Sequence, residues 1–436
     1  MSFRGTIDNW ADKIEEFSGK EYELEHLPSD KQKSMLGLLA VWAAATIVPS
    51  AFLTGGAMGN SLTFPEFAAT FFAGSFMMFV LACLVGYIAH DLGLTFHTLS
   101  RFFFGVRGSY IPSTLQVITR IGWGAVSLAF AVSFVVDLFA VDGFFLVTAI
   151  LGGFYLITAL MGFNGLKWIS YIAIPVFLGV YIFGLVGPIG LETPAGPMEE
   201  PVPLTAAIGI AASFWAAGSL VAADWLRFGQ SMRDVVVSSA IALLGFNLIA
   251  LGLGYFSVVA TGNPDISAGI ADAGFIVPAT FAIVLITWTT VDNWLYSGSL
   301  GVSNIFNIRK VYAVVLLGIV MIITAGFQVH TLVIPWLELL GAFLPPLAGP
   351  ILVEYYVLKN KMQFDMTDIN YDINGVAVGA WAIGSGVGYL APAVYIVPLV
   401  AIVVSIIAYL VLYLVFRSTA LYPSATISQS SPPADD

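Results

Sequence analysis

Long apolar runs separated by short polar stretches make up most of this chain. A membrane core about 30 Å thick requires roughly 20 consecutive apolar residues in a helix that crosses it. By this criterion the pattern predicts an all-α polytopic membrane protein with twelve spans. The spans are expected near residues 35–58, 65–89, 110–136, 143–162, 166–187, 204–223, 235–259, 271–295, 311–328, 331–356, 374–391 and 393–416.

Basic residues indicate how these spans are oriented, because cytoplasmic loops carry an excess of lysine and arginine. With the N-terminus inside, 15 of the 16 lysines and arginines fall in the tails or the inner loops. The outer loops contain acidic residues, namely Asp142, Glu192, Glu199, Glu200 and Asp265. We therefore expect a multi-pass protein of the cell membrane, with cytoplasmic tails at 1–34 and 417–436. The basic residue left over is Arg120, inside the third span.

Composition excludes a soluble globular protein. The chain is 58% hydrophobic and 10% charged, whereas soluble domains carry about 25% charged residues. Its one cysteine, Cys83, cannot form an intramolecular disulfide. The net charge of −11 is spread over both ends and many loops, and we expect no nucleic-acid partner.

Enzymatic and channel functions find little support in the sequence. The histidines lie outside the middle of the spans, and no metal-binding pattern such as HExxH occurs. We expect no catalytic residues, no bound metal and no cofactor. Channels rely on charged rings or carbonyl filters, usually in symmetric oligomers, and no such filter motif is present. A carrier that functions as a monomer in the lipid bilayer is the expectation.

Two spans contain small and polar residues in the middle of an apolar run. They read "PSAFLTGGAMGN" (49–60) in span 1 and "ASFWAAGSLVAAD" (212–224) in span 6. Small residues let membrane helices approach closely. Alternatively, helices interrupted five spans apart indicate an inverted repeat whose unwound backbone binds substrate and ion. The repeats would then be 35–187 and 204–356, followed by two further helices at 374–416.

Adjacent hydroxyl groups lie deep in span 8, in "ITWTTVDNWLYSGS" (286–299). Thr289 and Thr290 can bond locally to carbonyls one turn earlier in the helix. They can also serve as hard oxygen ligands for a small cation, completed by carbonyls from the broken part of span 1. Both interpretations remain open at this point.

Five stretches resemble one known family in the same order along the chain. They are "TFHTLSRFFFGVRGSYIPS", "IGWGAV", "SFWAAGSLVAADWLRFG", "WTTVDNWLYSGSLGVSNI" and "LPPLAGPILVEYY". The chain resembles the nucleobase–cation symporters, in particular bacterial cytosine permeases and their hydantoin-transporting relatives. This resemblance implies a leucine-transporter-type fold, with ten core helices plus two, and alternating access.

The resemblance also implies a binding site. Trp123 and Phe214 would sandwich a planar ring, since offset aromatic faces hold such rings well. Ser213 would bond the polar edge of the ring. The coupling cation, sodium or alternatively a proton, would be bound at Thr289 and Thr290 with the carbonyls of Ala44 and Ile47.

Several positions depart from the family pattern. Arg120 replaces a glutamine that bonds the base, and Ala216 replaces a serine of the pocket. Ile286 and Val291 replace asparagines near the cation and the base. Cytosine, another pyrimidine or a purine is the expected substrate. The alternative is an anionic or carbonyl-rich heterocycle, such as a hydantoin, hydroxymethylpyrimidine or allantoin-like compound, coupled to protons.

Three roles are open for Arg120. It lies roughly 15 Å inside span 3 by helical rise, so its side chain reaches the interface only with difficulty. It can form a buried ion pair with Glu338 of span 10, or face the pocket and bond a substrate through its planar donor group. A pair that opens on binding would act as a gate, and Glu338 could then carry a proton. We expect Arg120 to belong to the binding site.

Overall fold

The computed structural model describes a helical protein. It covers residues 12–14, 26–190, 200, 202–358, 369, 371–392 and 394–422. Within these residues the named elements are helices. Eight are long and apolar enough to cross a membrane, and three shorter apolar helices accompany them, Phe144–Ala159, Lys310–Gly326 and Gly375–Leu390. The predicted class, an all-α membrane protein, agrees with this architecture.

Helices lie within every predicted span. The first half contains α2 (Met35–Thr46), α3 (Pro49–Ser61), α4 (Phe64–Leu92), α5 (Phe96–Phe104), α6 (Tyr110–Phe139), α7 (Phe144–Ala159) and α8 (Gly162–Gly184). The second half contains α9 (Leu204–Val221), α10 (Ala223–Leu226), α11 (Met232–Ala240), α12 (Asn247–Thr261), α13 (Ile266–Asp272), α14 (Ile276–Phe306), α15 (Lys310–Gly326), α16 (Val333–Phe343) and α17 (Ala348–Leu352). The last two are α18 (Gly375–Leu390) and α19 (Val397–Phe416).

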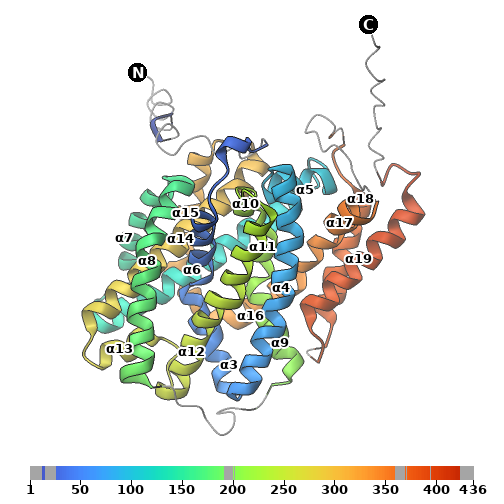
Figure 1. Ribbon diagram of the computed structural model, residues 1–436. Coiled ribbons are helices and arrows are strands. Elements are labelled where there is room, and N and C mark those ends of the chain that lie inside the picture. Colours follow the sequence, from blue (N-terminus) through green and yellow to red (C-terminus); the bar gives the residue numbers. More distant parts are fainter. Residues whose placement is uncertain are drawn as a thin grey trace.

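Neighbouring helices in the bundle come from distant parts of the chain. α3 packs against α12, α4 against α9, and α6 against α14. α18 and α19 pack mainly on each other, at one side of the bundle (Figure 1). The core of the bundle is therefore built by the segments from α2 to α17, and the last two helices lie at its edge.

Span 8 is the largest departure from the predicted bounds. It was expected at 271–295, but α14 runs from Ile276 to Phe306. Its extra turns contain three serines and one asparagine, which lower the hydropathy, yet these residues are buried. Asn304, for example, donates hydrogen bonds to Ser109 and Ser113 and accepts one from Arg101. Tertiary contacts thus extend the helix beyond the point where its apolar run ends.

Span 1 is interrupted, but not where the sequence suggested. α2 ends at Thr46 and α3 begins at Pro49, so Ile47 and Val48 lie outside both helices. Val48 is extended, with φ −131° and ψ 145°, because a following proline disfavours the helical conformation. Pro49 then suits the first helical turn, where its missing N–H costs nothing. The interruption precedes the stretch 49–60 instead of lying within it.

The glycines of that stretch are packing residues. A Cβ atom on Gly55 would lie 1.9 Å from the carbonyl oxygen of Leu251 on α12. In the reverse direction, a Cβ on Gly254 of α12 would lie 2.1 Å from the carbonyl oxygen of Phe52. Small residues thus bring the backbones of α3 and α12 into direct contact, as expected for membrane helices.

Span 6 is interrupted within the stretch where a break was expected, 212–224, but only near its end. α9 is helical from Leu204 to Val221, which includes Ser213 and Gly218. The helix is interrupted only at Ala222, and α10 follows directly. Gly218 has a local role, because the ring of Trp215 lies over it and a Cβ would be 2.1 Å from that ring. The interruption therefore lies within the predicted stretch 212–224, but near its end and not at Gly218, where a small residue makes room for an aromatic ring of the same helix.

Replacing Gly254 with alanine should destabilise the protein. The added methyl group meets backbone atoms of Phe52, which cannot move aside as a flexible side chain could. Overpacking of this kind costs about 1–3 kcal/mol. Thermal unfolding of the purified protein in detergent measures the effect. Gly252→Ala is the matched control on the same helix, because no atom lies within 4 Å of its added Cβ. Equal melting temperatures for the two variants would contradict the proposed close contact.

Candidate functional site

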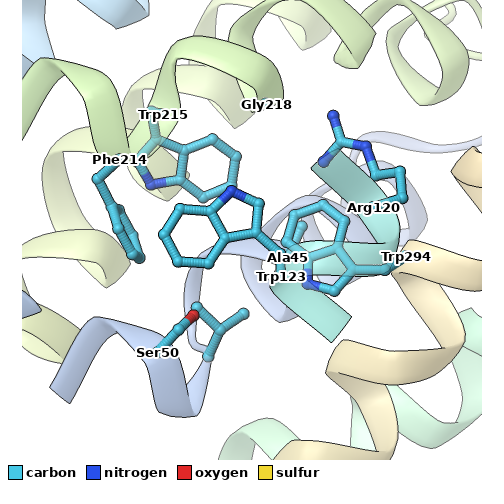
Figure 2. Close-up of a pocket in the computed structure, with 9 residues that line it drawn as sticks. Ala45, Ser50, Arg120, Trp123, Phe214, Trp215, Gly218 and Trp294 are labelled. Atoms are coloured by element: carbon cyan, nitrogen blue, oxygen red, sulfur yellow. The ribbon is translucent and has the colours of Figure 1, made fainter. Parts of the chain in front are cut away.

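A small cavity lies beside the interruption of span 1. The volume open to a water-sized molecule is only about 10 Å³, far below the usual range of ligand pockets, about 300–1,000 Å³. Figure 2 shows Phe214 and Trp215 on one side, Arg120 and Trp294 on the other, and Trp123 between them. The lining residues come from spans 1, 3, 6 and 8: Ala45, Val48, Ser50, Arg120, Trp123, Phe214, Trp215, Gly218 and Trp294.

The two predicted clamp residues meet in this cavity. The ring centroids of Trp123 and Phe214 are 5.2 Å apart, and the ring planes are inclined by 72°. This edge-to-face contact is a favourable aromatic geometry, but it leaves no space for a ring between them. The structure therefore shows the clamp closed on itself, and a sandwich requires the two rings to separate and become parallel.

Arg120 is fully buried at the edge of the same cavity. Its Nη2 donates to Oε1 of Gln116 at 2.9 Å and to the carbonyl oxygen of Ala217 at 3.2 Å. Its guanidinium also lies over the ring of Trp294, 4.6 Å from the centroid. A cation over an indole face is attracted by the negative face of the ring. These contacts hold the side chain in the interior, so it does not reach the interface.

A group of buried polar residues on α5, α10 and α14 lies near Arg120. The carboxylate of Asp224 accepts hydrogen bonds from the backbone N–H of Phe96 and from the Ser297 hydroxyl, both at 2.9 Å. Nε2 of His97 on α5 is 4.0 Å from the same carboxylate. Burial, together with the charge of Arg120, lowers the pKa of His97 to about 3, so its ring is neutral. Helix α5 is thus attached to α10 and α14 beneath the cavity.

The two threonines of span 8 bond to one carbonyl. The hydroxyls of Thr289 and Thr290 donate to the carbonyl oxygen of Ile286 at 2.9 and 2.8 Å. The local bonding considered from the sequence therefore occurs. It still leaves the lone pairs of both hydroxyl oxygens, because only their protons are used.

These threonines lie near the interrupted part of span 1. Ile47, which is outside both helices, packs in the same apolar cluster as Ile286. One turn further along α14, Asn293 donates to the carbonyl oxygen of Val41 at 3.4 Å. Ala44 lies in the last turn of α2, which packs against α14.

Comparison with known proteins identifies the family. The model of a family described as "Permease for cytosine/purines, uracil, thiamine, allantoin" matches residues 28–417. This chain belongs to that permease family. The permease is 31% identical over 397 residues to the cytosine permease of Escherichia coli strain K12, covering 88% of this chain and 92% of the relative. It is 24% identical to the hydantoin permease of Microbacterium maritypicum, covering 84% and 83% of the two chains.

Solved structures share the fold of the permease. One is Mhp1, a nucleobase-cation-symport-1 family transporter in a closed conformation with bromovinylhydantoin bound. The TM-score is 0.77 at 20% sequence identity, over 94% of this chain and 98% of Mhp1. The membership expected from the sequence is confirmed, and family members are transporters instead of enzymes.

Ser213 and Glu338 lie in a different cavity of the permease. This outer cavity has about 1,120 Å³ of empty volume and is lined by residues of α9, α16, α18 and α19. A Cβ on Gly341 of α16 would lie 2.1 Å from Oγ of Ser213, so Ser213 faces α16 and not the clamp. Glu338 is exposed, whereas Arg120 is buried and bonded elsewhere. The predicted ion pair between Arg120 and Glu338 is not formed, because the two groups belong to separate cavities.

Two further predicted pocket positions do not line the cavity. Ala216 and Val291 are buried in the apolar core. On α9, the cavity-facing positions are Phe214, Trp215 and Gly218, and Ala216 points away from them by helical spacing.

The sequence reasoning missed Trp215 and Trp294. A signal was available for Trp294, because it follows Thr290 by four residues and so shares a helix face with it.

Replacing Gly218 with alanine should weaken substrate binding. The added Cβ collides with the ring of Trp215 and pushes it toward the cavity that it lines. Repacking that costs about 1.4 kcal/mol lowers affinity tenfold. Competition for uptake of a labelled heterocycle measures the change in proteoliposomes. Gly179→Ala, which has no atom within 4 Å of its added Cβ, should leave the affinity unchanged. Wild-type affinity in Gly218→Ala would show that the position of Trp215 does not matter for binding.

Proposed function

We propose that this permease is a secondary active transporter that imports a planar heterocycle by cation symport. The observation that supports this most directly is the location of the cavity. It joins the interrupted backbone of span 1 to the aromatic rings of Trp123 and Phe214. Interrupted helices near the midplane are typical substrate and ion sites of secondary transporters. A nucleobase or related heterocycle matches the family description and the aromatic lining.

The proposed architecture is a five-plus-five inverted repeat followed by two helices. The eight long apolar helices, the three shorter ones and the interrupted pair α2–α3 give twelve spans in the described part of the chain. Corresponding contacts in the two halves support such a repeat. Span 1 packs on span 7 through α3 and α12, and span 6 packs on span 2 through α9 and α4. In the same way, α2 packs on α8, which joins spans 1 and 5. The corresponding contact in the second half is that of α9 with α16, which joins spans 6 and 10.

We assign the substrate position to the cavity between spans 1, 3, 6 and 8. As it stands, the cavity is too small for a ring, so it must widen when substrate binds. Trp123 and Phe214 would part to admit the ring between them. Their edge-to-face contact would give way to stacking of each ring on the substrate.

The coupling ion would be sodium. Thr289 and Thr290 offer two hydroxyl oxygens, and their protons are already directed at Ile286. Backbone carbonyls of Ala44 and Ile47 at the end of α2 would complete the set. Small hard cations prefer such oxygen ligands. The position at the interruption of span 1 would couple ion binding to substrate binding, because both sites share that segment.

Alternating access would require movement on both sides of the cavity. On the outer side, the Trp336 ring of α16 lies against Gly122, where a Cβ would be 2.6 Å from the ring. Gly122 is adjacent to Trp123, so α16 must move away before substrate can enter from outside. On the inner side, the hydrogen bonds of Asp224 to α5 and α14 must break or move with the opening helices.

We place the protein in the cell membrane as a monomer with both termini in the cytoplasm. The distribution of lysine and arginine along the chain supports this orientation. The repeats would span residues 35–187 and 204–356, followed by 374–416, with tails at 1–34 and 417–436.

Removing the two hydroxyls of span 8 should weaken coupling to sodium. The variant Thr289→Ala/Thr290→Ala loses two direct oxygen ligands of the proposed site. Loss of an indirect partner already reduces metal affinity by about 10–100-fold, so the sodium concentration for half-maximal uptake should rise at least about tenfold. Uptake into proteoliposomes at varied sodium and constant pH measures this. Counterflow of labelled against unlabelled heterocycle separates a carrier from a channel.

Thr287→Ala is the matched control for this variant. Its hydroxyl is also buried in α14 and also bonds to a carbonyl one turn earlier, that of Ile283, at 2.7 Å. It should keep the wild-type response to sodium. If uptake by the wild type depended on a proton gradient and not on sodium, the proposal that sodium is the coupling ion would be refuted.

A further inference from the structure

The cavity contains polar atoms that have no hydrogen-bond partner. Nε and Nη1 of Arg120 are buried and unpaired, and so are the indole Nε1 atoms of Trp215 and Trp294. All three side chains line the cavity. Buried polar groups are almost always hydrogen-bonded, so each exception calls for an explanation. Here, four nitrogen atoms around one small cavity lack a hydrogen-bond partner.

Every one of these atoms is a donor. Guanidinium and indole N–H groups donate hydrogen bonds and cannot accept them. Among the side chains that line the cavity, the one acceptor in the described residues is the hydroxyl of Ser50. Gln116, which could also accept, already receives a bond from Arg120 and donates to the Ala217 carbonyl. Among its side chains, the cavity therefore offers several donors to a ligand and a single acceptor.

A purely structural role does not account for this arrangement. Nη2 of Arg120 makes both of the hydrogen bonds that the side chain forms within the protein. The negative charge of Asp224 acts on Arg120, but its carboxylate oxygens are bonded to Phe96 and Ser297. Asp224 thus balances the charge without using the free N–H groups of Arg120.

We propose that these donors select a substrate rich in acceptors, a planar ring that carries at least two carbonyl or carboxylate oxygens. This inference rests on the proposed transport function and specifies its substrate class. Arg120 would bond one ring oxygen through its free N–H groups, and the indole N–H groups would bond a second. A ring with an amino group at the same edge would place a donor opposite the donors of the cavity, and no hydrogen bond would form between them. Unpaired buried groups are the main penalty in such a site.

Uracil and cytosine test the proposal as a matched pair. They share one ring and differ along one edge: uracil has a carbonyl at position 4 beside an N–H at position 3, whereas cytosine has an amino group at position 4 beside an acceptor nitrogen at position 3. A hydrogen bond to a charged group contributes about 1.5–3 kcal/mol, so uracil should bind roughly 10- to 100-fold more tightly. Thermal shift of the purified protein, which rises with binding to the folded state, and competition for uptake both measure this ratio. Uracil-6-carboxylate shows whether an anionic ring is preferred over a neutral one.

Variants then assign the preference to Arg120. In Arg120→Gln, a neutral group that can also accept replaces the donors, and the uracil preference should fall below about threefold. Trp294→Phe keeps the aromatic face but removes one donor, and should reduce the preference by less. Arg107→Gln is the control for removing an arginine, since Arg107 is 69% exposed and pairs with Asp372 at 3.6 Å. It should keep the wild-type ratio.

The outcomes separate the two proposals. Equal or tighter binding of cytosine by the wild type would overturn the substrate class and leave the transport function standing. An unchanged uracil preference in folded Arg120→Gln would remove Arg120 from the selection. Absence of both stabilisation and counterflow with all three rings would instead refute the transport function. The wild-type ratio decides the substrate class even if Arg120→Gln fails to fold.

Discussion

The structure depends on one constraint, that backbone polar groups inside a membrane must find partners within the protein. Continuous helices satisfy it automatically, so each interruption requires special surroundings. At Ile47 and Val48, Pro49 enforces the interruption, and buried residues of spans 3, 6 and 8 surround it. The same segment supplies backbone to the candidate substrate cavity and lies beside the threonines of span 8. Its position determines where both sites can be.

Much of the architecture could be predicted from the sequence, because hydropathy reports directly on membrane spans. The interruptions were harder. Glycines at 55 and 218 looked like signs of unwound backbone, but they accommodate neighbouring atoms inside intact helices. Small residues serve both purposes, and the sequence does not show what packs on them. Pro49 was the better signal, since its effect on the preceding residue is local and does not depend on packing.

In the candidate site, too, the sequence predicted some residues correctly, whereas the position of others depends on how the helices pack. Trp123, Phe214 and Arg120 were expected in the pocket from the family resemblance, and they do line one cavity. Ser213 and Glu338 could not be placed in this way, because a helix exposes several faces and only the packed bundle shows which face each cavity receives. Ser213 and Phe214 are adjacent in sequence, yet they line different cavities. The donors without partners became visible only once all the neighbours of Arg120 were in place.

The close contact between α3 and α12 has a mechanical consequence. With Gly55 against Leu251 and Gly254 against Phe52, the two backbones interlock at two points. Helices joined so closely cannot slide past one another without a steric clash, so we expect α3 and α12 to move together. Any rearrangement of α3 relative to α2 is then concentrated in the two residues between them, Ile47 and Val48. The segment that bounds the cavity thus also acts as its hinge.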